Sequence, residues 1–195
     1  MIHMAWATLI LAVACFASFA FGIRFYFVKP PEKTLPMYLV TEVGVAISLL
    51  HLGLLAYRGV WLGLLDPRAL AGACALYAAS LALYWWTLRT VREHRLTFAY
   101  TPDTPEVLIA AGPYRRVRHP FYTAYTLCYL AAPLALRAWW LLPTAIFMFL
   151  VYRRAAILEE RKFAASALAP AYRDYARRTG RFLPRLVSPG GLRGH

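Results

Sequence analysis

The residues best suited to chemistry lie in the second half of the chain, in three short segments. The first segment, Gly112–Tyr122, has the sequence GPYRRVRHPFY. Its Gly-Pro-Tyr start predicts a turn, and Pro120 is expected in the first turn of a helix, where its missing N–H is harmless. The free N–H groups and positive dipole end of that helix would suit an anion. Arg118 and His119 add cationic or donor groups beside it, and Tyr122 shares a helical face with His119.

The second segment is a pair of acidic residues, Glu159 and Glu160, near the end of a predicted helix. Adjacent side chains point about 100° apart on a helix, so the two carboxylates can serve different partners. A carboxylate opposite a basic helix start suits a zwitterionic ligand. Each of these two segments also has a structural explanation. The first can be the basic flank of a membrane helix that starts with a proline, and the second can be a solvated helix end in which Glu159 pairs with Lys162.

The third segment, residues 171–184, is basic and aromatic, with the sequence AYRDYARRTGRFLP. Such a segment can lie on anionic lipid, or it can supply an arginine that holds a substrate carboxylate by two parallel hydrogen bonds. No metal site is predicted. The chain has three cysteines, each within an apolar stretch, which favours a role as small apolar side chains in helices: Cys15, Cys74 and Cys128.

The composition predicts that a membrane surrounds the elements that position these segments. Of the 195 residues, 61% are hydrophobic and 16% are charged, whereas a soluble domain is closer to half apolar. The net charge is +13, and basic segments favour nucleic acid, anionic lipid headgroups or anionic cofactors. In so apolar a chain we expect lipid headgroups or a soluble anionic ligand, and no nucleic acid. The apolar N-terminal run has no basic region before it, which predicts a retained helix.

We therefore expect an all-α polytopic membrane protein with about five transmembrane helices, since each span needs about 20 apolar residues. The candidate spans are residues 4–28, 37–57, 69–88, 121–136 and 138–152. The last two are short and separated only by Arg137, which predicts a helical hairpin. The fifth helix is expected to continue as an amphipathic helix through Phe163, and a helical C-terminal segment should follow. This divides the chain into the first three spans, 1–88, and a site-bearing part, 89–195.

The distribution of lysine and arginine predicts the orientation of these spans. With five spans, 19 of the 22 basic residues fall on one side of the membrane and 3 on the other. The N-terminus is then outside and the C-terminus is in the cytoplasm, in the inner membrane of a bacterium. The loop 89–118 and the C-terminal region share the cytoplasmic side, where they can build one site.

Two ionisable residues, Glu42 and His51, lie inside the second candidate span. An ionisable group within a membrane segment is a candidate functional residue. The alternatives are structural: Glu42 lies near the cytoplasmic end and can pair with an arginine, and His51 can form a hydrogen bond between helices.

Together, the three segments resemble the isoprenylcysteine carboxyl methyltransferase family, which is related to the phospholipid N-methyltransferases. The family pattern is GPYxxxRHPxY, a short helical hairpin, EE, YxxYxxRV and a final proline. Within about 97–184 this chain supplies Gly112–Tyr122, Glu159, Glu160, Tyr172, Tyr175, Arg178 and Pro184. Leu168-Ala169 replace a Phe-Gly pair of the family, and Thr179 replaces its valine. Both departures affect what the resemblance implies about the substrate more than what it implies about the cofactor.

The resemblance implies an integral membrane methyltransferase that uses S-adenosyl-L-methionine and acts on a lipophilic or prenylated acceptor arriving from the bilayer. The residues it implies for cofactor binding are Tyr114, Arg118, His119, Pro120, Tyr122, Glu159 and Glu160. Arg178 is implied as the catalytic residue that positions an acceptor carboxylate, with Tyr172 and Tyr175 also in substrate binding. An ionised carboxylate is already nucleophilic, so no metal or general base is needed.

Three functional classes remain open at this point. The first is a methyltransferase, acting on a carboxylate or on an amine such as that of a phospholipid. The second is an NADPH-dependent membrane reductase with a similar C-terminal pocket, although such reductases are longer and have more spans. The third is a non-enzymatic membrane protein. Neither the acceptor nor the oligomeric state follows from the sequence.

Overall fold

The computed structural model describes residues 2–28, 35–93, 99–101 and 104–185, and its regular elements there are all helical. The long helices are α1 (Ile2–Phe25), α2 (Leu35–Leu54), α3 (Pro67–Val91), α4 (Pro120–Leu136), α5 (Leu142–Ala164) and α6 (Ala169–Arg178). Three short helical segments join them: the π-helix η1 (Leu55–Trp61), which continues α2, and the 3-10 turns η2 (Gly112–Arg115) and η3 (Trp139–Leu141). The predicted all-α class is confirmed.

Within the described residues, four helical stretches are long and apolar enough to cross a membrane. They are Ile2–Phe25, Val40–Trp61, Pro67–Val91 and Trp139–Ala164. The fourth expected span, α4, has 17 residues, which gives it a length of about 26 Å. It forms the predicted hairpin with α5, and α5 continues to Ala164 and so carries Glu159 and Glu160 in its last turns.

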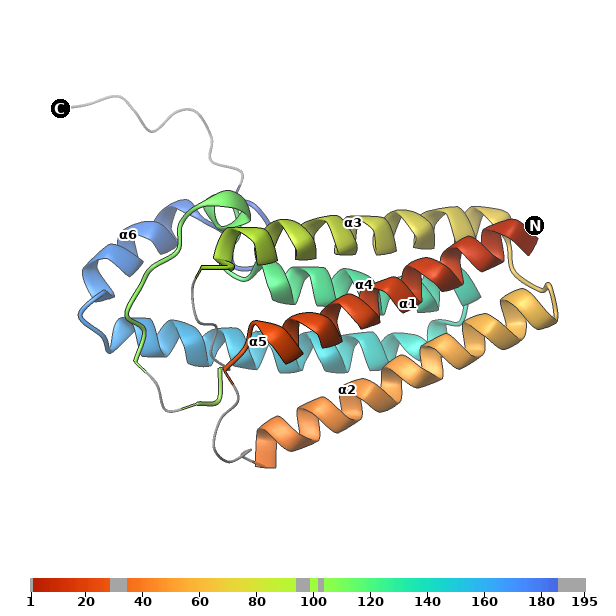
Figure 1. The fold of residues 1–195 in the computed structure, drawn as a ribbon, viewed down its shortest axis with the longest axis horizontal. Coiled ribbons are helices and arrows are strands. Elements are labelled where there is room, and N and C mark those ends of the chain that lie inside the picture. The colour runs from red at the N-terminus through yellow and green to blue at the C-terminus, as the bar shows by residue number, and fades with distance from the viewer. Residues whose placement is uncertain (1, 29–34, 94–98, 102–103, 186–195) are drawn as a thin grey trace, which may run out of the picture.

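The centre of the bundle is the contact between α3 and α4, with α1 crossing them and α2 oblique at the edge (Figure 1). Fully buried small residues, among them Ala73, Ala124 and Ala131, allow these helices to approach closely. The Ser80 hydroxyl donates to the Ala124 carbonyl oxygen at 2.7 Å, a hydrogen bond between α3 and α4. This packing fixes the start of α4 relative to the rest of the bundle.

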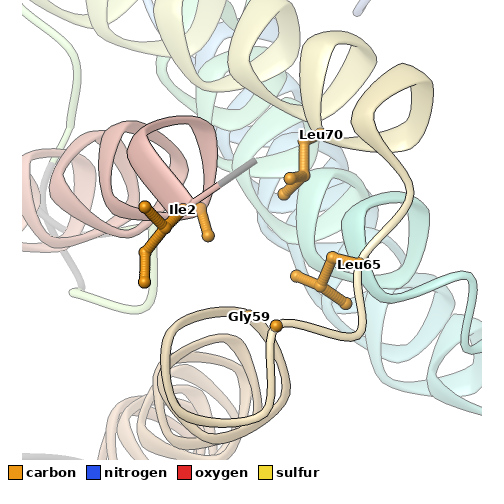
Figure 2. A pocket seen from close by; sticks show the side chains of 6 residues that line it. Ile2, Gly59, Leu65 and Leu70 are labelled. Atoms are coloured by element: carbon orange, nitrogen blue, oxygen red, sulfur yellow. The ribbon is translucent and has the colours of Figure 1, made fainter.

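One end of the bundle holds the α2–α3 connection and the turn of the hairpin. Asp66 caps α3 by accepting from the backbone N–H of Arg68 at 2.7 Å, and Arg137 Nη1 pairs with the same carboxylate at 3.1 Å. Arg137 has φ 48°, a left-handed conformation that ends α4. An apolar cavity of about 170 Å³ lies at this end, lined by Ile2, Ala5, Gly59, Gly63, Leu65 and Leu70 (Figure 2).

The opposite end of the bundle holds α6, η2 and the beginning of α4 (Figure 1). The three segments singled out in the sequence therefore meet at one end of the molecule. That end is also where the charged last turns of α5 extend past its apolar part, which reaches to about Tyr152.

Candidate functional site

Two segments that are far apart in the sequence run side by side at the start of α4. Gly180 N–H donates to the Arg116 carbonyl at 3.1 Å, Arg118 N–H to that of Gly180 at 2.8 Å, and His119 N–H to that of Arg181 at 3.1 Å. These bonds form a single parallel bridge, Val117 with Gly180. The chain that follows α6 is thus held against the residues that lead into α4.

Glu160 is the acceptor at the centre of this arrangement. Its Oε1 lies 3.1 Å from Arg118 Nε and 3.2 Å from His119 Nε2. Arg181 donates to both carboxylate oxygens, from Nε at 2.9 Å and from Nη2 at 2.6 Å, the two-bond geometry in which arginine binds carboxylates most strongly. Only 16% of the Glu160 side chain is exposed, so its bonds to the protein occupy most of it.

Glu159 faces a different set of partners, as expected for adjacent positions on a helix. The Tyr122 hydroxyl donates to its Oε1 at 2.5 Å, and its Oε2 lies 3.3 Å from His119 Nδ1. The rings of His119 and Tyr122 stack with 5.6 Å between their centroids. With 30% of its side chain exposed, Glu159 is more accessible than Glu160.

His119 therefore lies between two carboxylates and is itself only 7% exposed. Carboxylates only accept hydrogen bonds, so both ring nitrogens can donate to them only when the ring is protonated. Burial lowers the pKa of His119, but hydrogen bonds and charge from Glu159 and Glu160 outweigh it, and the pKa lies above its usual 6.5. The cluster then contains three positive groups, protonated His119, Arg118 and Arg181. Its two negative groups are Glu159 and Glu160, so its net charge is +1.

The structure brings together six of the residues predicted from the sequence: Arg118, His119, Pro120, Tyr122, Glu159 and Glu160. Tyr114 is close by, since its carbonyl oxygen accepts from the Tyr175 hydroxyl at 2.8 Å. Tyr172 stacks on Phe163 of α5 with ring centroids 4.8 Å apart. These tyrosines hold α6 against η2 and α5.

Arg178 lies elsewhere. It is the last residue of α6, is exposed, and lines a surface hollow with Asp174 and Arg177. In the described part of the chain its side chain makes no hydrogen bond or ion pair with Glu159 or Glu160, and the arginine after α6 that does so is Arg181.

Arg181 was not identified from the sequence. Three arginines occur within five residues at 177, 178 and 181, and helical spacing does not distinguish them. The signal that separates Arg181 is the glycine before it, because Gly180 follows the end of α6 and its backbone bonds to Arg116 and Arg118 beside His119.

A comparison with protein-family models matches residues 67–170 to the phospholipid methyltransferase family. This match covers more than half of the 195 residues. The chain belongs to the phospholipid methyltransferase family. No curated protein matches the chain in a sequence comparison.

The match to the phospholipid methyltransferases includes α3, the hairpin and both glutamates, and it ends before Arg178 and Arg181. Together with the apolar helices it makes the chain an integral membrane methyltransferase. Phospholipid methyltransferases share a superfamily with the isoprenylcysteine carboxyl methyltransferases. The family match therefore supports the superfamily that the sequence resembles, and not the isoprenylcysteine carboxyl methyltransferase family itself. Methyltransferases of this family generally use S-adenosylmethionine.

Proposed function

We propose that this phospholipid methyltransferase binds S-adenosylmethionine beside His119 and the two glutamates, and methylates the headgroup of a membrane lipid. The observation that carries the proposal is the position of His119 between Glu159 and Glu160 at the start of α4. A zwitterionic amino acid moiety needs cationic donors for its carboxylate and an anion for its ammonium. The N–H groups of the first turn of α4 and His119 suit the former, and Glu159 suits the latter.

The two glutamates have different roles in this proposal. Glu160 is engaged by Arg118, His119 and Arg181, so it is a positioning residue that ties the chain after α6 to the site. Glu159 is more exposed, and its partners among the described residues are the neutral Tyr122 hydroxyl and His119. Glu159 is therefore the carboxylate that would contact a cationic ligand.

The chemistry required of the protein is alignment and exclusion of water. When bound, the cofactor supplies a methyl group activated by its positively charged sulfur. His119, Glu159 and the first turn of α4 would hold that cofactor, and the acceptor would supply the lone pair that takes its methyl group. Groups that hold both reactants in one orientation can lower the barrier by several kcal/mol, and a closed site keeps water from competing.

The site favours an amine acceptor. In the part of the chain that the structure describes, the arginines that reach it, Arg118 and Arg181, are already bound to Glu160, so neither is free to hold an acceptor carboxylate. An amine acceptor needs no such cation. It would react in its neutral form after its proton has passed to solvent, while Glu159 holds the cofactor's ammonium.

A carboxylate acceptor is the second candidate. The exposed guanidinium of Arg178, beside the hollow it lines with Asp174 and Arg177, could hold such a group by two parallel hydrogen bonds. This candidate needs Arg178 to reach the methyl group held near Glu159.

Calorimetric titration of the detergent-purified protein with S-adenosylhomocysteine and with NADPH tests the cofactor. Binding of the former alone is expected, and Glu159→Gln should weaken it by roughly ten- to hundredfold, since a hydrogen bond to an ion contributes about 1.5–3 kcal/mol. Glu106→Gln, at an exposed position, is the matched control. Binding of NADPH alone, or equal effects of Glu159→Gln and Glu106→Gln, would contradict the proposed cofactor site.

Methyl transfer to two acceptors separates amine from carboxylate chemistry. Phosphatidylethanolamine vesicles and a prenylated cysteine with a free carboxyl group are incubated with labelled cofactor. We expect the label in the phospholipid. Label only in the prenylated cysteine would establish carboxyl methylation instead.

A further inference from the structure

The proposed cofactor site does not use the exposed face of α6, and most of this helix follows the part of the chain that matches the family. The buried side chains of α6 are those of Tyr172 and Tyr175. Positions three and four apart are neighbours on a helix, so its exposed charged residues share one side. These residues are Arg173, Asp174, Arg177 and Arg178.

Two guanidinium groups border a hollow on this side of α6. The hollow has a volume of about 250 Å³ and is lined by Asp174, Arg177 and Arg178. Arg177 forms an ion pair with Asp174. Arg178 has no hydrogen bond or ion pair with any residue that the structure describes. An anion in the hollow would therefore meet one unpaired guanidinium and one shared with a carboxylate, and guanidinium groups bind phosphate well.

α6 and the chain after it run back along α5 towards the bilayer (Figure 1). Near the start of α6, Tyr172 stacks on Phe163 in the last turn of α5. Beyond the end of α6, the ring of Phe182 lies 5.4 Å from that of Phe149, in the apolar part of α5. The Phe182 carbonyl oxygen also accepts from Thr123 Oγ1 at 3.0 Å, in the first turn of α4. The end of α6 therefore lies near the membrane surface.

Arg118 fixes the height of the last turn of α6. Its Nη1 donates to the carbonyl oxygens of Ala176 at 3.1 Å and of Thr179 at 2.5 Å. Arg177 and Arg178 lie between these two carbonyl groups in the chain, and Arg118 comes just before α4. The two arginines are thus at the level where α4 enters the membrane, which is the level of lipid headgroups.

An exposed apolar side chain follows the basic face of α6. Leu183 is 75% exposed, and it is the neighbour of Phe182, which lies beside the apolar part of α5. Apolar surface gains free energy when it leaves water, so acyl chains are the natural cover for a leucine at this depth. The arginines and Leu183 are therefore arranged in the order of a phosphate and its acyl chains.

The charge of this face favours an anionic phospholipid. Arg185 is exposed and donates to the Arg177 carbonyl oxygen, so it joins the arginines of α6. Its charge and theirs exceed that of Asp174 by three. A zwitterionic headgroup would bring an ammonium, which such a face repels. A soluble polyanion would leave Leu183 uncovered.

We propose that the exposed face of α6 binds an anionic phospholipid of the surrounding membrane. Its phosphate lies in the hollow between Arg177 and Arg178, and its acyl chains pass Leu183. This lipid lies beside the cofactor site and is not the methyl acceptor, so Arg178 holds it in place of an acceptor carboxylate. The binding depends neither on the cofactor nor on methyl transfer.

The test compares phosphatidylglycerol with phosphatidylcholine of the same acyl chains. Each lipid is titrated into the detergent-purified full chain, and bound lipids are counted by native mass spectrometry. A basic residue at the membrane surface strengthens the binding of anionic lipid by roughly fivefold. We therefore expect the wild type to prefer phosphatidylglycerol by roughly five- to twenty-five-fold, and the double variant Arg177→Gln, Arg178→Gln to lose most of this preference.

The matched control is Arg89→Gln with Arg92→Gln, which removes two exposed arginines from the end of α3. It should keep the preference for phosphatidylglycerol. No preference in the wild type, or the same loss in both double variants, would overturn the proposal.

A gain of binding provides a test that a misfolded variant cannot pass. Asp174→Asn removes the negative group from the hollow and releases Arg177, so it should strengthen phosphatidylglycerol binding several-fold. Glu93→Gln is the control, because Glu93 is an exposed carboxylate paired with Arg92 at 3.7 Å. No gain in Asp174→Asn, or an equal gain in both variants, would contradict the assignment.

A soluble headgroup distinguishes a lipid site from a site for free phosphate esters. Glycerophosphoglycerol carries the same phosphate as phosphatidylglycerol but has no acyl chains to lie against Leu183. We expect that it does not displace phosphatidylglycerol at equal concentration. Displacement would show that the hollow binds soluble phosphate esters and would refute a lipid-binding surface.

Discussion

His119 gives the candidate site a charge that depends on pH. Its folded pKa lies above 6.5. A raised pKa means that the folded state holds the proton more tightly than the unfolded chain does. The stabilisation is fully present below about pH 6.5 and is lost as the pH rises through the higher folded pKa.

This predicts that the melting temperature of the wild type decreases relative to that of His119→Gln as the pH rises above 6.5. Glutamine at position 119 carries no titrating proton, so the difference between the two melting curves isolates this residue. Thermal unfolding in detergent across the neutral and alkaline range measures it. A difference that is constant with pH would show that the carboxylates do not hold a proton on His119.

The two arginines of the C-terminal segment are predicted to behave differently. Arg181→Lys removes one of two parallel bonds to Glu160 and should weaken binding of S-adenosylhomocysteine, by about 1 kcal/mol or roughly fivefold. Arg178→Lys should leave that binding unchanged, because Arg178 is exposed at the end of α6.

Calorimetric titration and a methyl-transfer assay on the same variants measure both effects. If Arg178→Lys lowers turnover with a carboxylate acceptor while binding stays normal, Arg178 positions the acceptor. If Arg178→Lys leaves turnover with an amine acceptor unchanged, the result supports an amine as the methyl acceptor. Loss of cofactor binding in Arg178→Lys but not in Arg181→Lys would reverse the assignment.

Among the elements, the bridge between the α4 start and the chain after α6 depends on Gly180. A Cβ at this position would lie 1.7 Å from the Leu183 carbonyl oxygen, which is backbone and cannot move aside alone. Gly180→Ala should destabilise the fold by about 1–3 kcal/mol and weaken S-adenosylhomocysteine binding, because Arg181 is displaced.

Gly53→Ala is the control, since a Cβ there meets nothing within 4 Å. It lies in α2, where alanine favours the helix over glycine, so it should be neutral or slightly stabilising. Melting temperature and cofactor titration report on both variants. Equal behaviour of the two would mean that the bridge is not required.

Elements and motifs differ in how far the sequence predicts them. The helix start at Pro120 and the glutamates on α5 follow from local rules of spacing and apolar length, and they were predicted correctly. The contact of Arg181 with Glu160 depends on the chain after α6 folding back to pair with residues 116–119, and no periodicity encodes such a pairing. The second span was expected to end at Tyr57, but it continues to Trp61 as a π-helix, since apolar residues persist past the charged Arg58.

For the whole molecule, the basic bias predicts an outside N-terminus and a cytoplasmic C-terminus. If the chain crosses the membrane five times, 19 of its 22 basic residues fall on one side, and the positive-inside rule assigns that side to the cytoplasm. Reporter fusions active only in the cytoplasm should work at the C-terminus and fail at the N-terminus. Activity at both ends would require an even number of spans and would contradict five crossings. The span it would call into question is α4, the shortest of the helices expected to cross the membrane, with 17 residues.

The short length of α4 also has consequences for the surrounding lipid. At about 26 Å it falls some 4 Å below the usual hydrocarbon thickness of about 30 Å. Hydrophobic mismatch of this sign is relieved by local thinning of the bilayer. Headgroups next to Pro120 are then drawn inward, towards the level of His119. In the proposed reaction the acceptor would meet a water-soluble cofactor there without being lifted out of its leaflet.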